Sequence, residues 1–420
     1  MSSSIPADDQ AILSAFESHL ASAGFTRVRA AQHLETAEAF LGYLRNVGVA
    51  VAAATPEHLS RYLRTRLQGY RRRHRRSPHD TRSWRQREGA GIRRLLAHVQ
   101  GRWPPEAVAA NETESAVNFV LKDYERALRD ERVLASATIV HRLDTARRFL
   151  RHVSGRDLTA ALGQLSVTSI DQYIKRWATT GMARSTCRAL CINLRSLLRF
   201  LRATSRMPHD LAPSVITPSS YRYEGLPSTI SAEQIRAILA AARKDRSDTG
   251  IRDYAVLQLL AIYGLRAGEI CQLRLDDIDW RGERLWIRHA KTGGRTCLPL
   301  LPQVGEALLS YLRQVRPACP DREVFIRMHA PRRAFLARTA IYSLLRRHLA
   351  GVGIRLNGKR GPHIFRHARA ASLLMTGVPL KTVGDLLGHR SAAATAVYLK
   401  IDDSRLREVA LSLPVPEVSP

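Results

Sequence analysis

Residues 361–400 read GPHIFRHARAASLLMTGVPLKTVGDLLGHRSAAATAVYLK, a stretch rich in imidazole and guanidinium groups. Its side chains that could hold an oxyanion or exchange a proton with one include His363, Arg366, His367, His389 and Tyr398. Asp385 is the sole carboxylate of the stretch, so acidic metal ligands are scarce. Cationic side chains with a tyrosine suit an anionic substrate, and phosphate is the simplest candidate.

The same stretch divides into short helices. The pattern predicts a helix over 363–376, with Gly377 as its stop. Two further helices are expected, and the last of them carries Tyr398. Because His363 and Arg366 are three residues apart on one helix, they share a face and can aim at one phosphate.

Two further cationic residues come from earlier parts of the chain. Arg266 follows a tight glycine turn, and Glu269 at i+3 could support its guanidinium. Lys291 lies between two strand-like segments, 284–289 and 295–300, and the Gly pair of KTGG predicts a β-hairpin. At the tip of a hairpin, Lys291 would have the reach of a flexible proton donor.

Tyr398 is the hydroxyl nucleophile candidate among these bases. A tyrosine in water has a pKa of about 10 and is a poor nucleophile. Two Arg and two His nearby would favour the phenolate and stabilise a phosphorane-like transition state, without requiring Mg²⁺. Each of these residues alone more often has a structural role, but their combination favours phosphoryl transfer to tyrosine. No cofactor and no metal site is expected.

The charge of the chain indicates a polyanionic partner. The 420 residues contain 66 Lys and Arg against 37 Asp and Glu, a formal net charge of +29. Only seven of the basic residues are Lys, and Arg binds phosphate through a planar bidentate fork. A high-GC codon bias would explain the scarcity of Lys but not the excess of bases. The balance therefore indicates nucleic acid.

Cysteine usage and hydropathy bear on the compartment. The chain has five Cys and no CxxC pair, which suits a reducing environment. Its N-terminus does not resemble a secretory signal, and no run approaches the roughly 18 apolar residues of a membrane span. We expect a cytoplasmic, nucleoid-associated protein that has no membrane partner.

The N-terminal half contains amphipathic helices in two similar sets. The segment 33–41 (HLETAEAFL) resembles 142–150 (RLDTARRFL), and the order of two further matches, at 59–62 with 170–173 and at 92–96 with 194–198, is kept. Amphipathic helices share Leu and Ala, so coincidence is an alternative. Three matches in one order favour a tandem helical duplication.

A basic run, YRRRHRRSP, occupies 70–78 between two predicted helices. Such a run is usually a solvated loop. In a chain this basic, contact with a DNA backbone is an equal alternative.

Taken together, the motifs resemble those of the tyrosine recombinase family (phage-integrase type). The motifs that carry the resemblance are Leu265-Arg266-Ala-Gly-Glu269, Lys291 in AKTGG, His363-Ile-Phe-Arg366-His367, Leu387-Gly-His389-Arg390 and Tyr398 in AVYLK. The resemblance is strong over roughly 227–412, and the order of the six catalytic positions is intact. Phe365 departs from the usual Leu of the HxxRH box, a packing change that should be tolerated.

The resemblance implies a mainly α fold with a small β-hairpin or sheet in the catalytic domain, preceded by helical SAM-like core-binding domains. The corresponding domains are a helical N-terminal domain, possibly a duplicate, at 1–105, a core-binding domain at 115–204, a linker at 205–227, a tyrosine recombinase catalytic domain at 228–413 and a tail at 414–420. The piece at 404–413 could dock on a neighbouring protomer or pack in cis.

The resemblance also implies residue roles. Tyr398 attacks the scissile phosphate and forms a 3′-phosphotyrosyl link, while Arg266 and Arg366 hold the non-bridging oxygens. Lys291 protonates the leaving 5′-oxygen. His363 acts in proton transfer with Tyr398, and His389 hydrogen-bonds the phosphate. His367 and Glu269 are structural supports.

The implied activity is site-specific DNA recombination of the integrase or transposase type, without metal or ATP. Double-stranded DNA is the partner, and a homo-tetramer on two DNA sites, possibly with related recombinase subunits, would carry out strand exchange. The main alternative is a catalytically idle DNA-binding accessory subunit of a recombinase complex. A topoisomerase IB-like relaxing enzyme would use similar chemistry. A metal-dependent nuclease is disfavoured, because no carboxylate cluster appears beside the motif residues.

Overall fold

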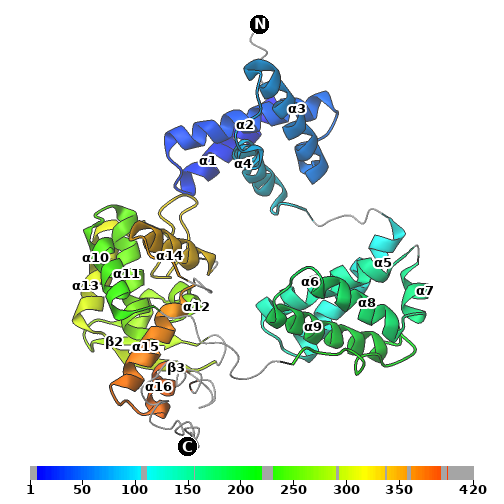
Figure 1. Ribbon diagram of the computed structural model, residues 1–420. Helices are drawn as coiled ribbons and strands as arrows, with labels where there is room; N and C mark the ends of the chain where they lie inside the picture. Colours follow the sequence, from blue (N-terminus) through cyan, green and yellow to red (C-terminus); the bar gives the residue numbers. More distant parts are fainter. Residues whose placement is uncertain are drawn as a thin grey trace, which may run out of the picture. The chain divides into compact units, whose positions relative to one another are not determined.

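The computed structural model describes residues 7–105, 111–155, 157–219, 230–289, 293–335, 338–356, 361–388 and 395. The chain divides into two compact units, Met1–Trp103 with Gly225–Pro420, and Pro104–Glu224. The elements of each are labelled in Figure 1. Within the described ranges, no helix combines the length and the apolar character needed to cross a membrane.

The N-terminal helices pack closely around aromatic and aliphatic side chains. They are α1 (Ala7–Ser22), α2 (Arg27–Asn46), α3 (Pro56–His74) and α4 (Thr81–Gln100), with a 3₁₀ turn at Val51–Ala53. Thr55 caps α3, and Pro56 occupies the first position of the helix. Gly91 of α4 lets α2 approach closely, because an added Cβ would lie 2.7 Å from the carbonyl oxygen of His33.

The basic run at 70–78 differs from the expected loop. The helix α3 continues through His74 and ends at Arg75, which has a φ of 51°. Arginine favours helices, and positive side chains in a last turn complement the helix dipole. Most of the arginines of the run therefore stand on a helix rather than in a solvated loop.

The second unit is also helical. Its helices are α5 (Glu112–Arg126), extended by a π turn at Ala127–Glu131, then α6 (Ser136–Val153), α7 (Leu158–Gly163), α8 (Val167–Ala178) and α9 (Arg184–Ala203). Cys187 and Cys191, one helical turn apart, are buried in its core. The hydroxyl of Tyr124 donates to Ser196 Oγ at 2.9 Å, which satisfies a polar group in the interior.

The two helical sets share a packing detail at matched positions. The rings of Phe40 and Tyr62 lie 5.2 Å apart at 77°. Those of Phe149 and Tyr173 lie 5.1 Å apart at 80°. These are the residues that the alignment of 33–41 with 142–150 and of 59–62 with 170–173 pairs. Edge-to-face rings at both places are an independent similarity between the sets.

The C-terminal part is helical around a small sheet. Its helices are α10 (Ala232–Lys244), α11 (Asp248–Tyr263), α12 (Ala267–Cys271), α13 (Pro302–Ser310) with a π turn at Tyr311–Val315, α14 (Thr339–Gly351), α15 (His363–Met375) and α16 (Leu380–Leu386). The strands β1 (Ile278–Asp279), β2 (Arg284–Arg288) and β3 (Arg295–Pro299) form an antiparallel sheet in the order β1-β2-β3. The predicted hairpin is present, and β1 adds a strand that the sequence did not reveal.

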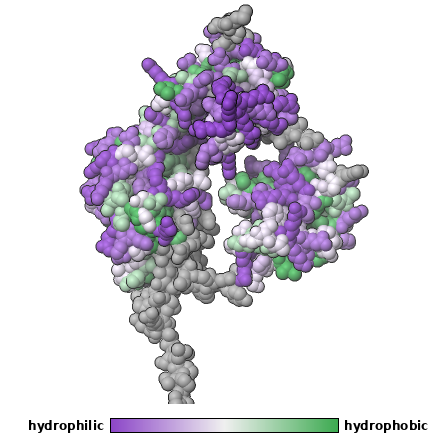
Figure 2. All heavy atoms as spheres, turned by 45° about the horizontal axis from the view of Figure 1, so that its top comes forward, coloured by the Kyte–Doolittle hydropathy of each residue, from purple (hydrophilic) through white to green (hydrophobic). Residues whose placement is uncertain are grey.

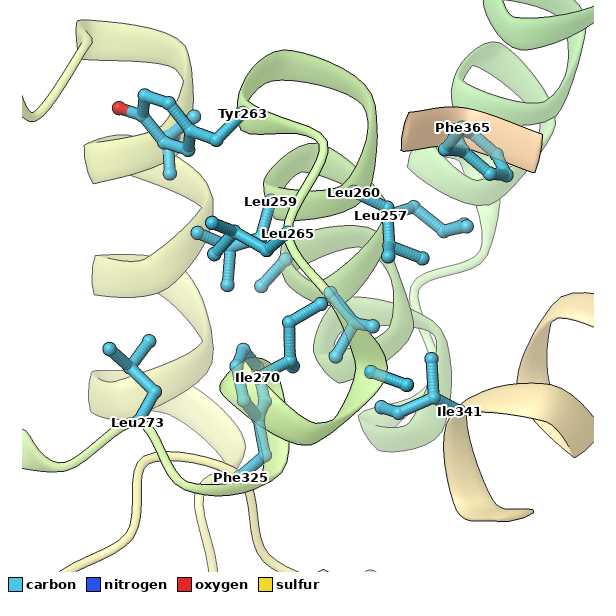
Figure 3. Close-up of a cluster of buried hydrophobic side chains, with 14 of the residues drawn as sticks. Leu257, Leu259, Leu260, Tyr263, Leu265, Ile270, Leu273, Phe325, Ile341 and Phe365 are labelled. Carbon is cyan, nitrogen blue, oxygen red and sulfur yellow. The ribbon is translucent and has the colours of Figure 1, made fainter. Parts of the chain in front are cut away.

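The helix α11 runs through the core of this part. Its buried residues include Leu257, Leu259 and Leu260, and Figure 3 shows Leu257 and Leu260 on the side toward Phe365 of α15 and Ile341 of α14. Phe365 is fully buried, so the aromatic ring in place of the usual Leu fills interior space. Burying one such side chain contributes about 1.5–3 kcal/mol. This packing holds α11 against α15. The candidate site lies where the C-terminal end of α11 meets α15.

Candidate functional site

Arg266 is fixed by the turn that ends α11. Gly264 closes that helix in the left-handed region, with a φ of 62°, and Arg266 is the N-cap of α12. Glu269 accepts the backbone N–H of Arg266 at 2.8 Å and its guanidinium Nη1 at 2.7 Å. The side chain of Arg266 stays 22% exposed, so part of the guanidinium faces outward. The sequence predicted this support by Glu269, and the geometry provides it.

The carboxylate of Glu269 is charged although it is buried. Burial alone would raise the pKa of Glu269. Hydrogen bonds from the Arg266 backbone, from His289 and from the Arg266 guanidinium outweigh burial and lower that pKa. Glu269 therefore remains a fixed counter-charge behind Arg266 at neutral pH.

Arg366 ties three segments together. Its side chain on α15 is 3% exposed. The guanidinium donates to the carbonyl oxygen of Gly264 at 3.1 Å and to that of Leu387. The site thus contains a buried arginine at the junction of α11, α15 and α16.

His363 stands one turn before Arg366 and is exposed. It lines a pocket together with Arg266, Ala267, Gly268, Glu269, Arg338 and Tyr342. The two predicted catalytic residues that the structure brings into one pocket are therefore His363 and Arg266, with Glu269 as the predicted support. The supporting residue His367 is on the same helix, with its ring 6.2 Å from that of His363.

Sequence reasoning missed two residues of this pocket, Arg338 and Tyr342. The ring of Tyr342 packs on Gly361, where an added Cβ would overlap with Tyr342 Cε1. This contact fixes the chain just before His363. One arginine among so many carries no distinguishing signal, and Tyr342 lies at an ordinary position of an amphipathic helix.

Sequence reasoning also missed His289, which is 5% exposed at the end of the strand pattern of β2. Its Nδ1 lies 2.8 Å from Glu269 Oε1 and its Nε2 lies 2.8 Å from Thr296 Oγ1. Leu285 and Ile287 are the buried positions of β2, and His289 continues their alternation. A polar residue at an inward-facing position was the signal that could have revealed it.

Lys291, His389 and Tyr398 lie outside the described residues. Of the six predicted catalytic positions, the structure therefore places Arg266, His363 and Arg366. Over the described ranges, no group of three or more His, Cys, Asp or Glu side chains is arranged to hold a metal ion.

Comparisons with known proteins show the family to which the chain belongs. A profile described as the phage integrase family matches residues 228–405. The protein y4rA of Sinorhizobium fredii (strain NBRC 101917 / NGR234), named as an integrase/recombinase, is 33% identical over 403 residues, which cover 95% of this chain and 93% of y4rA. The chain belongs to the phage integrase family of tyrosine recombinases.

Two further similarities extend the comparison. The protein y4gC of the same organism, also named as an integrase/recombinase, is 53% identical over 194 residues, 46% of this chain and all (100%) of y4gC. The crystal structure of a lambda integrase tetramer bound to a Holliday junction covers 74% of this chain and 85% of its own, with a TM-score of 0.52 and 16% identity. That likeness shows the fold. As a tyrosine recombinase, this protein acts in site-specific DNA recombination.

Proposed function

We propose that this recombinase cuts and rejoins DNA strands through a covalent 3′-phosphotyrosyl intermediate on Tyr398, without a metal ion or ATP. The observation that carries the proposal is the pocket that Arg266 shares with His363, one helical turn from the buried cation of Arg366. If the guanidinium groups of Arg266 and Arg366 hold the same phosphate, they stabilise the two equatorial oxygens that gain charge in the transition state.

The proposed step transfers one phosphate ester from the DNA 5′-oxygen to the tyrosine oxygen. The phenolate oxygen of Tyr398 attacks the phosphorus, the P–O5′ bond breaks, and its electron pair goes to the 5′-oxygen. Lys291 donates the proton that makes the 5′-hydroxyl, and His363 takes part in proton transfer with Tyr398. His389 hydrogen-bonds the phosphate. The ester bond energy is retained in the phosphotyrosyl link, so rejoining needs no external energy source.

Strand exchange between two DNA sites would need four active sites, one for each cleaved strand. We propose a homo-tetramer on two double-stranded sites, possibly including related recombinase subunits. The lambda integrase of the compared structure is a tetramer on a Holliday junction, and its fold matches this chain. The C-terminal segment at 404–413, a candidate for docking between protomers, lies outside the described residues.

The N-terminal helices are proposed to be a second DNA-binding copy of the helical set at 115–204. Residues 61–103 contain fourteen arginines against two carboxylates, whereas residues 1–60 contain three arginines against six. Those of α3 and α4 at the surface include Arg64, Arg71, Arg72, Arg73, Arg82 and Arg85. The N-terminal helices present a mostly hydrophilic face at the top of Figure 2. Such an arginine surface fits a sugar-phosphate backbone.

The test uses nicked suicide DNA, from which the short 5′-hydroxyl strand diffuses away after cleavage. The wild-type chain should form a protein–DNA adduct that survives denaturation, and Tyr398→Phe should form none. EDTA should leave the adduct yield unchanged. A wild-type chain that binds the DNA but never forms the adduct would instead identify the accessory-subunit alternative. Relaxation of supercoiled DNA by the monomer would favour the topoisomerase-like alternative.

A further inference from the structure

We propose that His289 is a positioning residue for the cleavage step. Its side chain joins the hairpin that carries Lys291 to the Arg266–Glu269 pair. The inference rests on the proposed function, because the role of Lys291 as proton donor belongs to it. Neither the family motifs quoted above nor the residue roles that they imply include position 289.

The imidazole of His289 is bonded on both sides. Glu269 is an acceptor, so Nδ1 carries the proton and donates to Glu269 Oε1 at 2.8 Å. The other nitrogen then accepts from the Thr296 hydroxyl, with Nε2 and Oγ1 2.8 Å apart. One ring therefore connects the start of α12 to both strands of the hairpin.

The backbone of His289 also closes the hairpin. Its N–H donates to the carbonyl oxygen of Gly294 at 2.9 Å, and its carbonyl accepts the N–H of Gly293 at 2.8 Å. Lys291 is two residues further along the chain. Hydrogen bonds of both its backbone and its ring thus fix His289, the residue two positions before Lys291.

The same ring lies against the turn that precedes His389. Gly388 has a φ of +61°, and a Cβ added there would overlap with both Cε1 and Nε2 of His289. The ring therefore occupies the space beside Gly388, while Arg366 holds the neighbouring carbonyl of Leu387. His289 therefore connects the end of the strand that precedes Lys291 with the turn at Gly388 that precedes His389.

Packing alone does not account for a histidine here. The inward positions Leu285 and Ile287 of β2 show that an apolar side chain satisfies this face of the sheet. A leucine at 289 would fill similar volume but would leave Glu269 without one of its donors. The histidine is the group that relates the hairpin to the carboxylate behind Arg266.

The cleavage chemistry provides a readout that a merely structural role would not change. With a normal phosphodiester, the leaving 5′-oxygen needs a proton. With a 5′-bridging phosphorothiolate, the P–S bond breaks and the electron pair goes to sulfur, and a thiolate leaves without a proton. Misplacing the proton donor should therefore slow cleavage of the oxygen substrate much more than that of the sulfur substrate.

The experiment measures single-turnover cleavage of both suicide substrates and DNA affinity for the full-length wild type, His289→Leu, His289→Asn and Lys291→Ala. We expect His289→Leu to slow cleavage of the oxygen substrate by tenfold or more, on the order expected when general-acid geometry is lost, with DNA affinity changed less than about threefold. The sulfur substrate should recover most of that loss, as it should for Lys291→Ala. His289→Asn keeps an N–H donor and should lie between wild type and His289→Leu.

Tyr263→Phe is the matched control. The hydroxyl of Tyr263 donates to the carbonyl oxygen of Pro299 at 2.6 Å and accepts the N–H of Leu301 at 3.1 Å, at the opposite end of β3. Its loss removes buried hydrogen bonds from the same sheet without approaching Glu269. This variant should cleave both substrates at rates close to wild type.

The outcomes distinguish the inference from the proposed function. If His289→Leu slows both substrates equally, or slows cleavage no more than Tyr263→Phe, His289 does not position the proton donor and the inference is wrong. If the wild type forms no adduct on either substrate, the proposed function itself fails. If Lys291→Ala shows no recovery with sulfur, Lys291 is not the proton donor, and the inference falls with that role.

Discussion

Glu269 accepts two hydrogen bonds from Arg266, one from the backbone N–H at 2.8 Å and one from the guanidinium at 2.7 Å. The two bonds fix both ends of the arginine, so its side chain has little freedom before DNA arrives. Pre-organised charge costs no reorganisation during the reaction. Because the pair forms without DNA, its contribution to the stability of the fold can be measured on the free protein.

Glu269→Gln should destabilise the C-terminal part of the chain. The amide places an N–H₂ group against the donors of Arg266 and His289, which costs about 1–3 kcal/mol for a buried group. Because the fold lowers the pKa of Glu269 from its ordinary value of 4.5, the charged form contributes stability above that pH and loses it as the pH falls through the folded pKa. Urea unfolding should show a large difference from wild type at pH 7 that narrows below pH 4.5.

Glu57→Gln is the control for that measurement. Glu57 pairs with Arg61 at 3.0 Å on the surface of α3, where their side chains are 77% and 62% exposed. A pair of this kind contributes little to stability, so its loss should be barely measurable at either pH. An equal effect of Glu269→Gln at both pH values would show that its charge does not matter to the fold.

The two arginines of the site should respond differently to lysine. Arg366→Lys removes a fork that spans the carbonyls of Gly264 and Leu387, and we expect a loss of about 2 kcal/mol or more. Arg266 is partly exposed, so Arg266→Lys should cost less than about 1 kcal/mol in stability. Both variants should lose most strand cleavage, since an ammonium cannot hold two phosphate oxygens. Unfolding and adduct formation measured together would check this contrast, and equal stability losses would contradict it.

The turn at Gly388 offers a test with an internal control. Gly388 and Gly377 both have positive φ, of +61° and +85°, but only Gly388 faces the ring of His289, since nothing lies within 4 Å of a Cβ at 377. Gly377→Ala should therefore cost about 1 kcal/mol from backbone strain alone and leave cleavage intact. Gly388→Ala adds a steric clash and should reduce both stability and cleavage. Similar losses for the two variants would mean that contact with His289 is unimportant.

Much of the architecture followed from periodicity and punctuation in the sequence. The Gly377 stop and the KTGG hairpin are local signals, and the structure has α15 and the β2–β3 pair where they indicate. The sequence did not predict that α3 continues through residues 70–74, because a run of like charges by itself is typical of a loop. Local patterns therefore predicted which helices and strands are present better than the residues at which they begin and end.

The site was predictable where a residue is marked by its neighbours in sequence. Arg266 with Glu269, and His363 with Arg366, are pairs at i+3, so a helix places them without knowledge of the tertiary fold. Arg338, Tyr342 and His289 enter the site from segments distant in sequence. Their roles depend on how α14 and β2 pack against α12 and α15, which local patterns do not determine.

The arginines at the end of α3 should contribute to DNA affinity by neutralising phosphates. Replacing Arg71, Arg72 and Arg73 with Gln should weaken binding and reduce the slope of log Kd against log salt, by up to about 0.9 for each phosphate that is no longer neutralised. The matched control neutralises Arg243, Lys244 and Arg246, because these are exposed at or just after the C-terminal end of a helix and their loss changes the net charge equally. Fluorescence anisotropy with duplex DNA over a salt series would measure both. An unchanged slope for the α3 variant, or an equal change in the control, would show that these arginines form only a solvated surface.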